Sequence, residues 1–241
     1  MAIAQILRAS TSPKANRLLA ALPEAAYRRL LPDFEATTLR VGEVLFHKAG
    51  RLQYAYFPTS AVATLSYAVE EGRPMAKAWP VGREGVVGVS IFLGNGRREH
   101  NATVQVAGLA VRLPAAALMN EFRRAGMLQH LLLRYVFALV TQASQLGVCN
   151  YHHPIEQRLC RFLSLGFDRV AGDRIAFTHQ HIAELLGVRR ESITEAASRL
   201  QSQGVIEYQR GNIRLISRKK LQERSCPCGA IIQRAFQSVF E

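Results

Sequence analysis

The chain has 241 residues, of which 49% are hydrophobic, and a formal net charge of +13. This apolar content indicates a globular chain with room for two domains, each with its own core, and argues against a disordered one. The positive charge favours a polyanionic partner such as nucleic acid, although Lys and Arg are spread too widely to locate its binding site.

The sequence also bears on location. The most apolar run, Leu131 to Val140, is short for a bilayer span and is interrupted by Arg134. The N-terminus contains Arg8, Lys14 and Arg17 and lacks the apolar block of a secretory peptide. We therefore expect a cytoplasmic protein with no membrane partner and with free, reduced thiols at Cys149, Cys160, Cys226 and Cys228.

The first half of the chain changes texture near residue 35. Residues 1–35 are predicted to be helical, with an apolar face made of Leu18, Leu19, Leu22, Tyr27, Leu30 and Leu31. From Leu39 to Leu113, short apolar runs alternate with turns that contain glycine. The runs are Val44–Phe46, Tyr54–Phe57, Val62–Tyr67, Lys77–Val81, Val86–Phe92, Thr103–Val106 and Ala110–Leu113. This spacing predicts an antiparallel barrel or sandwich.

A long helix is predicted from Met127 to His152, because this stretch has helical periodicity and no proline before Pro154. Its length would be roughly 39 Å. Apolar residues at heptad positions predict a parallel coiled-coil dimer, and an alternative is a single helix buried in its own chain. The predicted seam is Leu132, Val136, Leu139, Ala143 and Leu146. The expected domains are therefore 1–125, 126–153 and 154–241.

Residues 177–200 predict two short helices joined by a tight turn. Thr178 suits the N-cap of the first helix, and Gly187 suits the left-handed position at its end. The second helix begins near Arg189 and would bury Ile193, Ala196, Ala197 and Leu200. This pattern is typical of a helix-turn-helix.

The exposed face of the second helix would carry Arg190, Glu191, Thr194 and Glu195. Arginine can bind guanine, glutamate can accept from cytosine, and threonine can contact the thymine methyl group. Two short strands around the turn 209–212 follow, as in a winged domain, with Arg210 and Arg214 near phosphates. An ordinary α+β subdomain with a solvated charged helix is the alternative.

Taken in order, the strands, the long helix and the winged helix-turn-helix resemble the Crp/Fnr family of bacterial transcription regulators. The most telling segments are LRVGEVLFHKAG (39–50), YAYFPTSAVATL (54–65) and VGREGVVGV (81–89). The resemblance implies an α+β fold with an N-terminal antiparallel β-roll of the cyclic-nucleotide-binding kind. It also implies a homodimer that binds double-stranded DNA at two half-sites roughly 34 Å apart, with RNA polymerase as a further partner.

The resemblance also assigns roles on the DNA-binding face. Arg190 and Glu191 match base-reading positions, and Thr178 and Gln180 match positions that contact phosphate. Glu195 departs from the best-known members, which carry arginine there. A carboxylate cannot donate to guanine, so the preferred half-site should differ from theirs at one base, where losing a bidentate contact changes discrimination by roughly 1–3 kcal/mol. Further phosphate contacts are expected from Arg189 and Arg199.

An effector site in the β-roll is only partly present. Members that bind cyclic nucleotides use a Gly-Glu pair and an Arg-Ser pair. Here Glu84 and Gly85 lie near the first, whereas His100 and Asn101 replace the second. Neutral side chains hold phosphate poorly, and on the long helix only Ser144 offers a hydroxyl where the base is contacted. Cyclic AMP is therefore disfavoured, and another small effector, or none, is expected.

The chain is not expected to bind metal or to be an enzyme. Cys226 and Cys228 form too small a set for a structural metal site, and the histidines beside Cys149, His152 and His153, are usually solvated at a helix end. A metal-dependent barrel enzyme would need several clustered histidines, but the segment near Glu43 has only His47. An architectural DNA-binding protein without an effector remains the other alternative.

Overall fold

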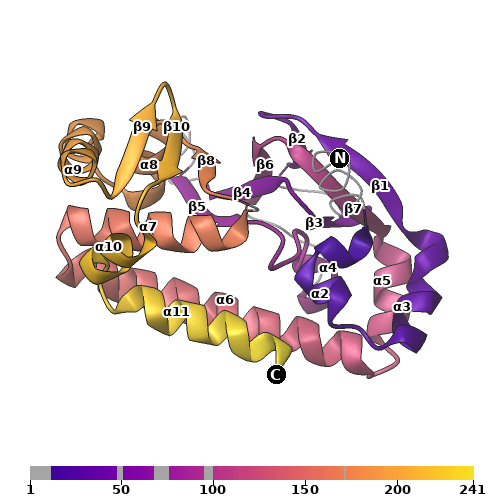
Figure 1. The fold of residues 1–241 in the computed structure, drawn as a ribbon. Helices are drawn as coiled ribbons and strands as arrows, with labels where there is room; N and C mark the ends of the chain where they lie inside the picture. The colour runs from indigo at the N-terminus through magenta and orange to yellow at the C-terminus, as the bar shows by residue number, and fades with distance from the viewer. Residues whose placement is uncertain (1–11, 48–50, 68–75, 95–99, 171) are drawn as a thin grey trace, which may run out of the picture. The chain divides into compact units, whose positions relative to one another are not determined.

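The computed structural model describes residues 12–47, 51–67, 76–94, 100–170 and 172–241 (Figure 1). The chain divides into two compact units, Met1–Val136 with Phe240 and Phe137–Val239 with Glu241. The division falls inside the long helix and not at either of its ends.

The first unit contains two antiparallel sheets, as expected for a β-roll. One sheet has the order β1-β7-β3, made of Glu35–Leu39, Gly108–Pro114 and Tyr54–Pro58. The other has the order β2-β6-β4-β5, made of Val44–Phe46, His100–Val106, Val62–Tyr67 and Ala76–Val81. Leu39 and Ala110 of the first sheet share a buried cluster with Val104 of the second. The core of this unit therefore lies between the two sheets.

Short helices surround these sheets. They are η1 (Pro13–Ala15), α2 (Arg17–Ala20), α3 (Glu24–Leu30), η2 (Leu31–Asp33), α4 (Ser90–Leu93) and α5 (Ala115–Phe122). Five of the six residues predicted to form the N-terminal apolar face are buried, but Leu31 is exposed, because the helix has changed to a 3₁₀ turn at Pro32.

Two strand predictions in this unit were wrong. The strand β1 begins at Glu35, the last residue of the stretch predicted to be helical, and its residues Glu-Ala-Thr-Thr-Leu pair with β7. The run Val86–Phe92 forms no strand beyond a single bridge from Val87 to Tyr56, and it ends in α4. Gly88, with φ +117°, takes a conformation that interrupts an extended strand there.

The long helix α6 spans Met127–His152, as predicted. Leu128, Leu131, Leu132 and Tyr135 on one face are buried in the chain itself. Contrary to the sequence expectation, α6 is long and apolar enough by length and composition to cross a membrane, and it is the one such helix in the described ranges. The buried face accounts for only part of this apolar character, because 28% of the apolar 18-residue window is buried.

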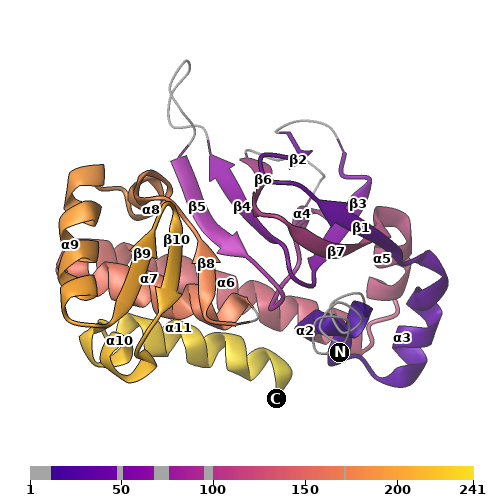
Figure 2. The same cartoon turned by 45° about the horizontal axis from the view of Figure 1, so that its top comes forward.

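The second unit is mainly helical (Figure 2). After α6 it contains α7 (Ile155–Arg169), α8 (His179–Leu186), α9 (Arg190–Ser202), α10 (Arg218–Arg224) and α11 (Cys228–Gln237). The 3₁₀ turn η3 (Ser238–Phe240) follows, and its last residue, Phe240, is grouped with the first unit. Its antiparallel sheet has the order β8-β10-β9, from Arg174–Ala176, Asn212–Leu215 and Ile206–Gln209. The sequence predicted the hairpin β9-β10, whereas β8 was not predicted.

Candidate nucleic-acid interface

The turn between α8 and α9 is built from local sequence signals. The Thr178 hydroxyl accepts a hydrogen bond from the backbone N–H of His181 at 3.1 Å, which caps the start of α8. Gly187 is left-handed with φ +63° and ends α8, where the N–H of Val188 donates to the carbonyl of Ala183 at 3.0 Å. The chain is thereby redirected into α9 within a few residues.

The helix α9 has one buried face and one exposed face. Ile193, Ala196, Ala197 and Leu200 are buried, as their spacing of three and four predicts. The predicted DNA-contacting side chains on α9 and its N-cap are all exposed: Arg189, Arg190, Glu191, Thr194, Glu195 and Arg199. This exposed face therefore has the shape and the polar groups required to enter a major groove.

The wing is a hairpin with a two-residue turn, visible between β9 and β10 in Figure 1. Gln209 pairs with Asn212, and the turn residues Arg210 and Gly211 have φ angles of +49° and +82°. Two positive φ angles characterise the type I′ turn that matches the twist of paired strands. The exposed side chain of Arg210 is thus presented at the tip of the wing.

Side-chain contacts join the wing to both helices. The N–H of Tyr208 donates to Oε1 of Gln201 at 2.8 Å. The ring of Tyr208 stacks on His179, with centroids 3.9 Å apart. Nδ1 of His179 lies 3.0 Å from Oγ1 of Thr194, which also donates to the carbonyl of Arg190 at 3.1 Å. The wing, α8 and α9 thus form one connected surface.

His179 is the ionisable group most affected by this surface. Burial lowers the pKa of His179, and the nearby guanidinium of Arg190 lowers it further. The imidazole is therefore held in its neutral form, in which it can act as either donor or acceptor toward Thr194. No local pattern in the sequence singled out this histidine.

Three predicted phosphate-contacting residues have partners of their own. The amide of Gln180 donates to Glu184 at 2.9 Å, and the hydroxyl of Thr178 serves as the cap of α8. Nε of Arg199 donates to Glu156 of α7 at 2.9 Å. A phosphate would have to compete with Glu156 for the Arg199 side chain. Arg199 is therefore less available for a phosphate contact than the sequence suggested.

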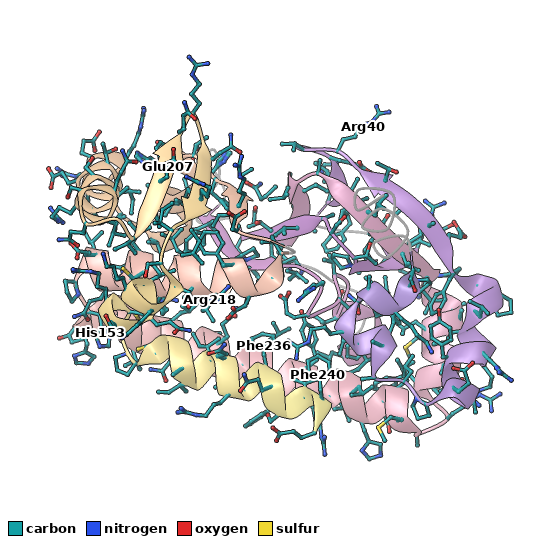
Figure 3. The ribbon with its side chains drawn as sticks, viewed as in Figure 1. Arg40, His153, Glu207, Arg218, Phe236 and Phe240 are labelled. Atoms are coloured by element: carbon teal, nitrogen blue, oxygen red, sulfur yellow. The ribbon has the colours of Figure 1, made fainter. Side chains whose placement is uncertain are left out.

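The outer face of the sheet adds a polar hollow of about 320 Å³. It is lined by Arg174, Glu207, Gln209, Asn212, Ile213 and Arg214. Arg214 donates to Glu207, its neighbour across the hairpin, and Figure 3 labels Glu207 on the wing. Arg174 was missed from sequence because its strand is only three residues long.

In the first unit, the predicted effector residues Glu84 and Gly85 are occupied by the protein itself. The carboxylate of Glu84 is buried and accepts from the N–H of Gly82 at 3.2 Å. The carbonyl of Gly85 accepts from Nδ2 of Asn16 at 2.9 Å. A Cβ atom on Gly85 would clash with Oη of Tyr135, so the fold leaves no room there. These contacts lie within the protein, and the role of the pair in effector binding stays a prediction.

The other predicted effector residues are His100 and Asn101 in the sheet and Ser144 on α6. His100 packs against Phe46 and Tyr67, and Asn101 is paired with Ser66 in the sheet. Ser144 is exposed on α6, in the second unit. Arg97 and Arg98, the basic residues that precede His100 and Asn101 in the sequence, lie outside the described residues.

An open hollow of about 510 Å³ does exist in the first unit, near α4 and α5. None of the predicted effector residues lines it. Its polar lining residues are Arg51, Ser90, Asn120 and Arg123.

The predicted dimer seam is rotated relative to the exposed face of α6. Leu132 is fully buried in its own chain, which corrects its assignment to a dimer interface. Val136, Leu139 and Leu146 are half-buried, and Ala143 is exposed. The exposed apolar row lies about 100° further around the helix, where Leu133, Phe137 and Val140 each follow a seam residue by one position. It consists of Leu133, Phe137, Val140, Val148 and Tyr151.

One group of potential metal ligands lies in the second unit. Cys149, His153, Cys226 and Cys228 each place a ligand atom within 4.8 Å of the others. Burial raises the pKa of Cys149 to about 12, although the Arg161 guanidinium opposes the rise. The expectation of no metal site treated the two halves of this group separately, whereas the fold brings them together.

Comparison with known proteins adds family information for part of the second unit and fold information for most of the chain. Residues 157–224 match the family model of the Crp-like helix-turn-helix domain. No curated protein matches the sequence.

Among solved structures, FixK2 from Bradyrhizobium japonicum is 16% identical, with 80% of this chain and 98% of that chain covered and a TM-score of 0.64. A CRP-family transcriptional regulator from Thermus thermophilus is 16% identical, with 78% and 96% covered and a TM-score of 0.61. The c-di-GMP responsive global regulator CLP from Xanthomonas campestris is 15% identical, with 81% and 100% covered and a TM-score of 0.53.

Proposed function

We propose that this chain, a Crp/Fnr-type protein by its Crp-like helix-turn-helix domain and its fold, regulates transcription as a sequence-specific homodimer on a near-palindromic DNA site. Regulators of this type are transcription factors and not enzymes. The family resemblance further implies a cytoplasmic location and contact with RNA polymerase.

One observation carries the proposal of sequence-specific binding. The face of α9 that holds Arg190, Glu191, Thr194 and Glu195 is exposed, while the opposite face is buried in the domain. Arg190 can donate two hydrogen bonds to guanine, and Glu191 can accept from the amino group of cytosine. Arg189 and Arg210 flank this face and would contact phosphates, and these contacts position the helix without reading sequence.

Selection of bound sequences from random duplex DNA tests this function directly. We expect a palindromic consensus with a fixed half-site spacing of about one helical turn. Binding that shows no sequence preference would instead support an architectural role. Absence of binding at low salt would contradict both readings, because phosphate contacts are strongest there.

The dimer proposal rests on the exposed apolar row of α6. Phe137, Val140 and Tyr151 are 68%, 56% and 86% exposed, which is unfavourable for large apolar side chains in water. Their spacing of seven or fourteen residues from one another or from Leu133 suits a helix–helix seam. We infer that a second copy of the chain covers this row, with Ala143 at its margin.

A pair of lysine substitutions distinguishes the exposed row from the seam predicted from sequence. Phe137→Lys should give monomers, because it places a charge in the middle of the row, whereas Asn150→Lys, which lies off the row, should leave dimers. Sedimentation of both variants measures the difference. Asn150 lies seven residues after Ala143 and so continues the seam predicted from sequence. A monomeric Asn150→Lys beside a dimeric Phe137→Lys would therefore favour that seam.

The geometry also constrains an effector. Because Glu84 and Gly85 are occupied by contacts within the protein, we infer that a small effector would bind elsewhere in the β-roll. Cyclic AMP held by this pair is therefore disfavoured, as the sequence also indicates.

A further inference from the structure

Two short ligand pairs, far apart in the sequence, meet beside the start of α7. Cys149 and His153 are four residues apart at the end of α6, and the N–H of His153 donates to the carbonyl of Cys149 at 3.0 Å. Cys226 and Cys228 flank Pro227 at the start of α11. Residues four apart on a helix project from the same side. The first pair therefore presents its two ligand atoms in one direction, and both sulfurs of the second pair lie within 4.8 Å of them.

The distances suit a single small ion. Sγ of Cys149 lies 3.4 Å from Sγ of Cys226, and Sγ of Cys228 lies 3.6 Å from Nδ1 of His153. Zinc–sulfur bonds of about 2.3 Å in a tetrahedron place neighbouring sulfurs roughly 3.8 Å apart. The four atoms thus need to move only slightly, whereas a multinuclear cluster would spread its ligands over several metal atoms.

Two buried arginines of α7 lie near the cluster. Arg158 and Arg161 of α7 are both buried, and the Nε atom of each lacks a hydrogen-bond partner among the described residues. Arg161 lies close enough to Cys149 for their charges to interact, and Arg158 lies close enough to Cys149 and Cys226. Three thiolates and one divalent cation carry a net charge of −1. Such a site would provide an anionic neighbour for these two guanidinium groups.

One outer contact is already in place. Nε2 of Gln145 lies on α6 one turn before Cys149 and donates to Sγ of Cys228 at 3.1 Å. Hydrogen bonds to a ligating sulfur orient it and disperse its charge. Figure 3 labels His153 near the start of α11.

We propose that Cys149, His153, Cys226 and Cys228 bind one zinc ion in a closed, tetrahedral Cys₃His site. Three of the four ligands are buried and all four positions are filled by protein, which is typical of a structural site. The site fastens α11 to the end of α6. The part that matches the Crp-like domain is residues 157–224. Cys149 and His153 precede it, and Cys226 and Cys228 follow it.

Metal analysis of the full-length protein, purified under reducing conditions without chelator, gives the first test. We expect about one zinc per chain, and tetrahedral cobalt–thiolate absorption after replacement by Co²⁺. Iron in place of zinc would overturn the proposal. So would a Cys149–Cys226 disulfide in protein that takes up no metal after reduction.

Two adjacent histidines provide a matched pair of variants. Apo-protein of His153→Gln and His152→Gln is titrated with Zn²⁺ alone against a chelating dye. His153→Gln should bind zinc at least about tenfold more weakly than the wild type, whereas His152→Gln, which is exposed and outside the cluster, should match it. Equal affinity of the two variants would overturn the assignment.

The cysteines are tested in the same way. Cys228→Ala should lose the stoichiometric zinc, and Cys160→Ala, which removes a buried thiol outside the cluster, should retain it. Retention of zinc by Cys228→Ala would count against the site. None of these measurements involves DNA, so their failure would leave the proposed regulatory function intact.

Discussion

The helix-turn-helix and the loop at Glu84 contain candidate ligand-binding residues of the same kind, yet the fold treats them in opposite ways. In α9, the buried face holds the domain together and leaves Arg190 and Glu191 exposed. In the loop, Glu84 and Gly85 are themselves part of the internal packing. A polar residue is available for binding only where other residues stabilise its backbone.

The largest expected effect concerns Asn16, whose side chain holds the Glu84 loop in place. Its Oδ1 accepts from the N–H groups of Leu18 and Leu19, and its Nδ2 donates to the carbonyls of Pro58 and Gly85. Asn16→Ala should lower the free energy of unfolding by about 2–4 kcal/mol, because it removes a helix cap and leaves buried carbonyls unpaired. Urea unfolding measures the loss.

Asn120→Ala is the control for this prediction, since Asn120 is exposed on α5. It should change stability by less than about 0.5 kcal/mol. If both variants unfolded at the same urea concentration, the Asn16 contacts would not be what fixes the loop, and Glu84 could again be considered for ligand binding.

A smaller effect is expected at Arg190, on the exposed side of the comparison. Arg190→Ala should leave folding unchanged and relax specificity at one base pair of each half-site by roughly 1–3 kcal/mol. Binding to a panel of single-base variants of the selected site measures this. Affinity lost evenly over the panel would show that Arg190 contacts only phosphate.

The smallest effect is expected at His179, which links the two helices. Its folded pKa is lowered, so the folded state binds a proton less readily than the unfolded chain does. The stability that depends on neutral His179 is therefore present above about pH 6.5 and declines as the pH falls below it.

Thermal unfolding between about pH 7.5 and 5.5 measures this decline. His179→Gln should flatten the dependence of stability on pH, and His130→Gln, an exposed residue of α6, should leave it as in the wild type. An unchanged slope in His179→Gln would place the proton uptake on another group.

The sequence predicted those features that depend on short-range periodicity. The bounds of α6, the cap at Thr178, the turn at Gly187 and the wing hairpin all follow from residues within a few positions of one another. Because each element could be predicted locally, their order along the chain then predicted the fold class.

The features that were missed depend on contacts between distant residues. The residues next to Glu84 do not show that the Asn16 side chain will donate to the carbonyl of Gly85. The residues next to Cys149 do not show that its Sγ will lie 3.4 Å from Sγ of Cys226. The heptad pattern in α6 was present, but two rows of apolar residues compete there, and only packing of Leu132 and its neighbours shows which row is buried.

The turn of the wing has a consequence of its own. Arg210 adopts a positive φ, which costs a residue with a side chain of order 1 kcal/mol and which asparagine or glycine tolerates better. The substitution Arg210→Asn should therefore make the hairpin more stable. It should also lower the affinity for DNA, because one cationic contact to the phosphate backbone is removed. At this position, thermostability and affinity would change in opposite directions.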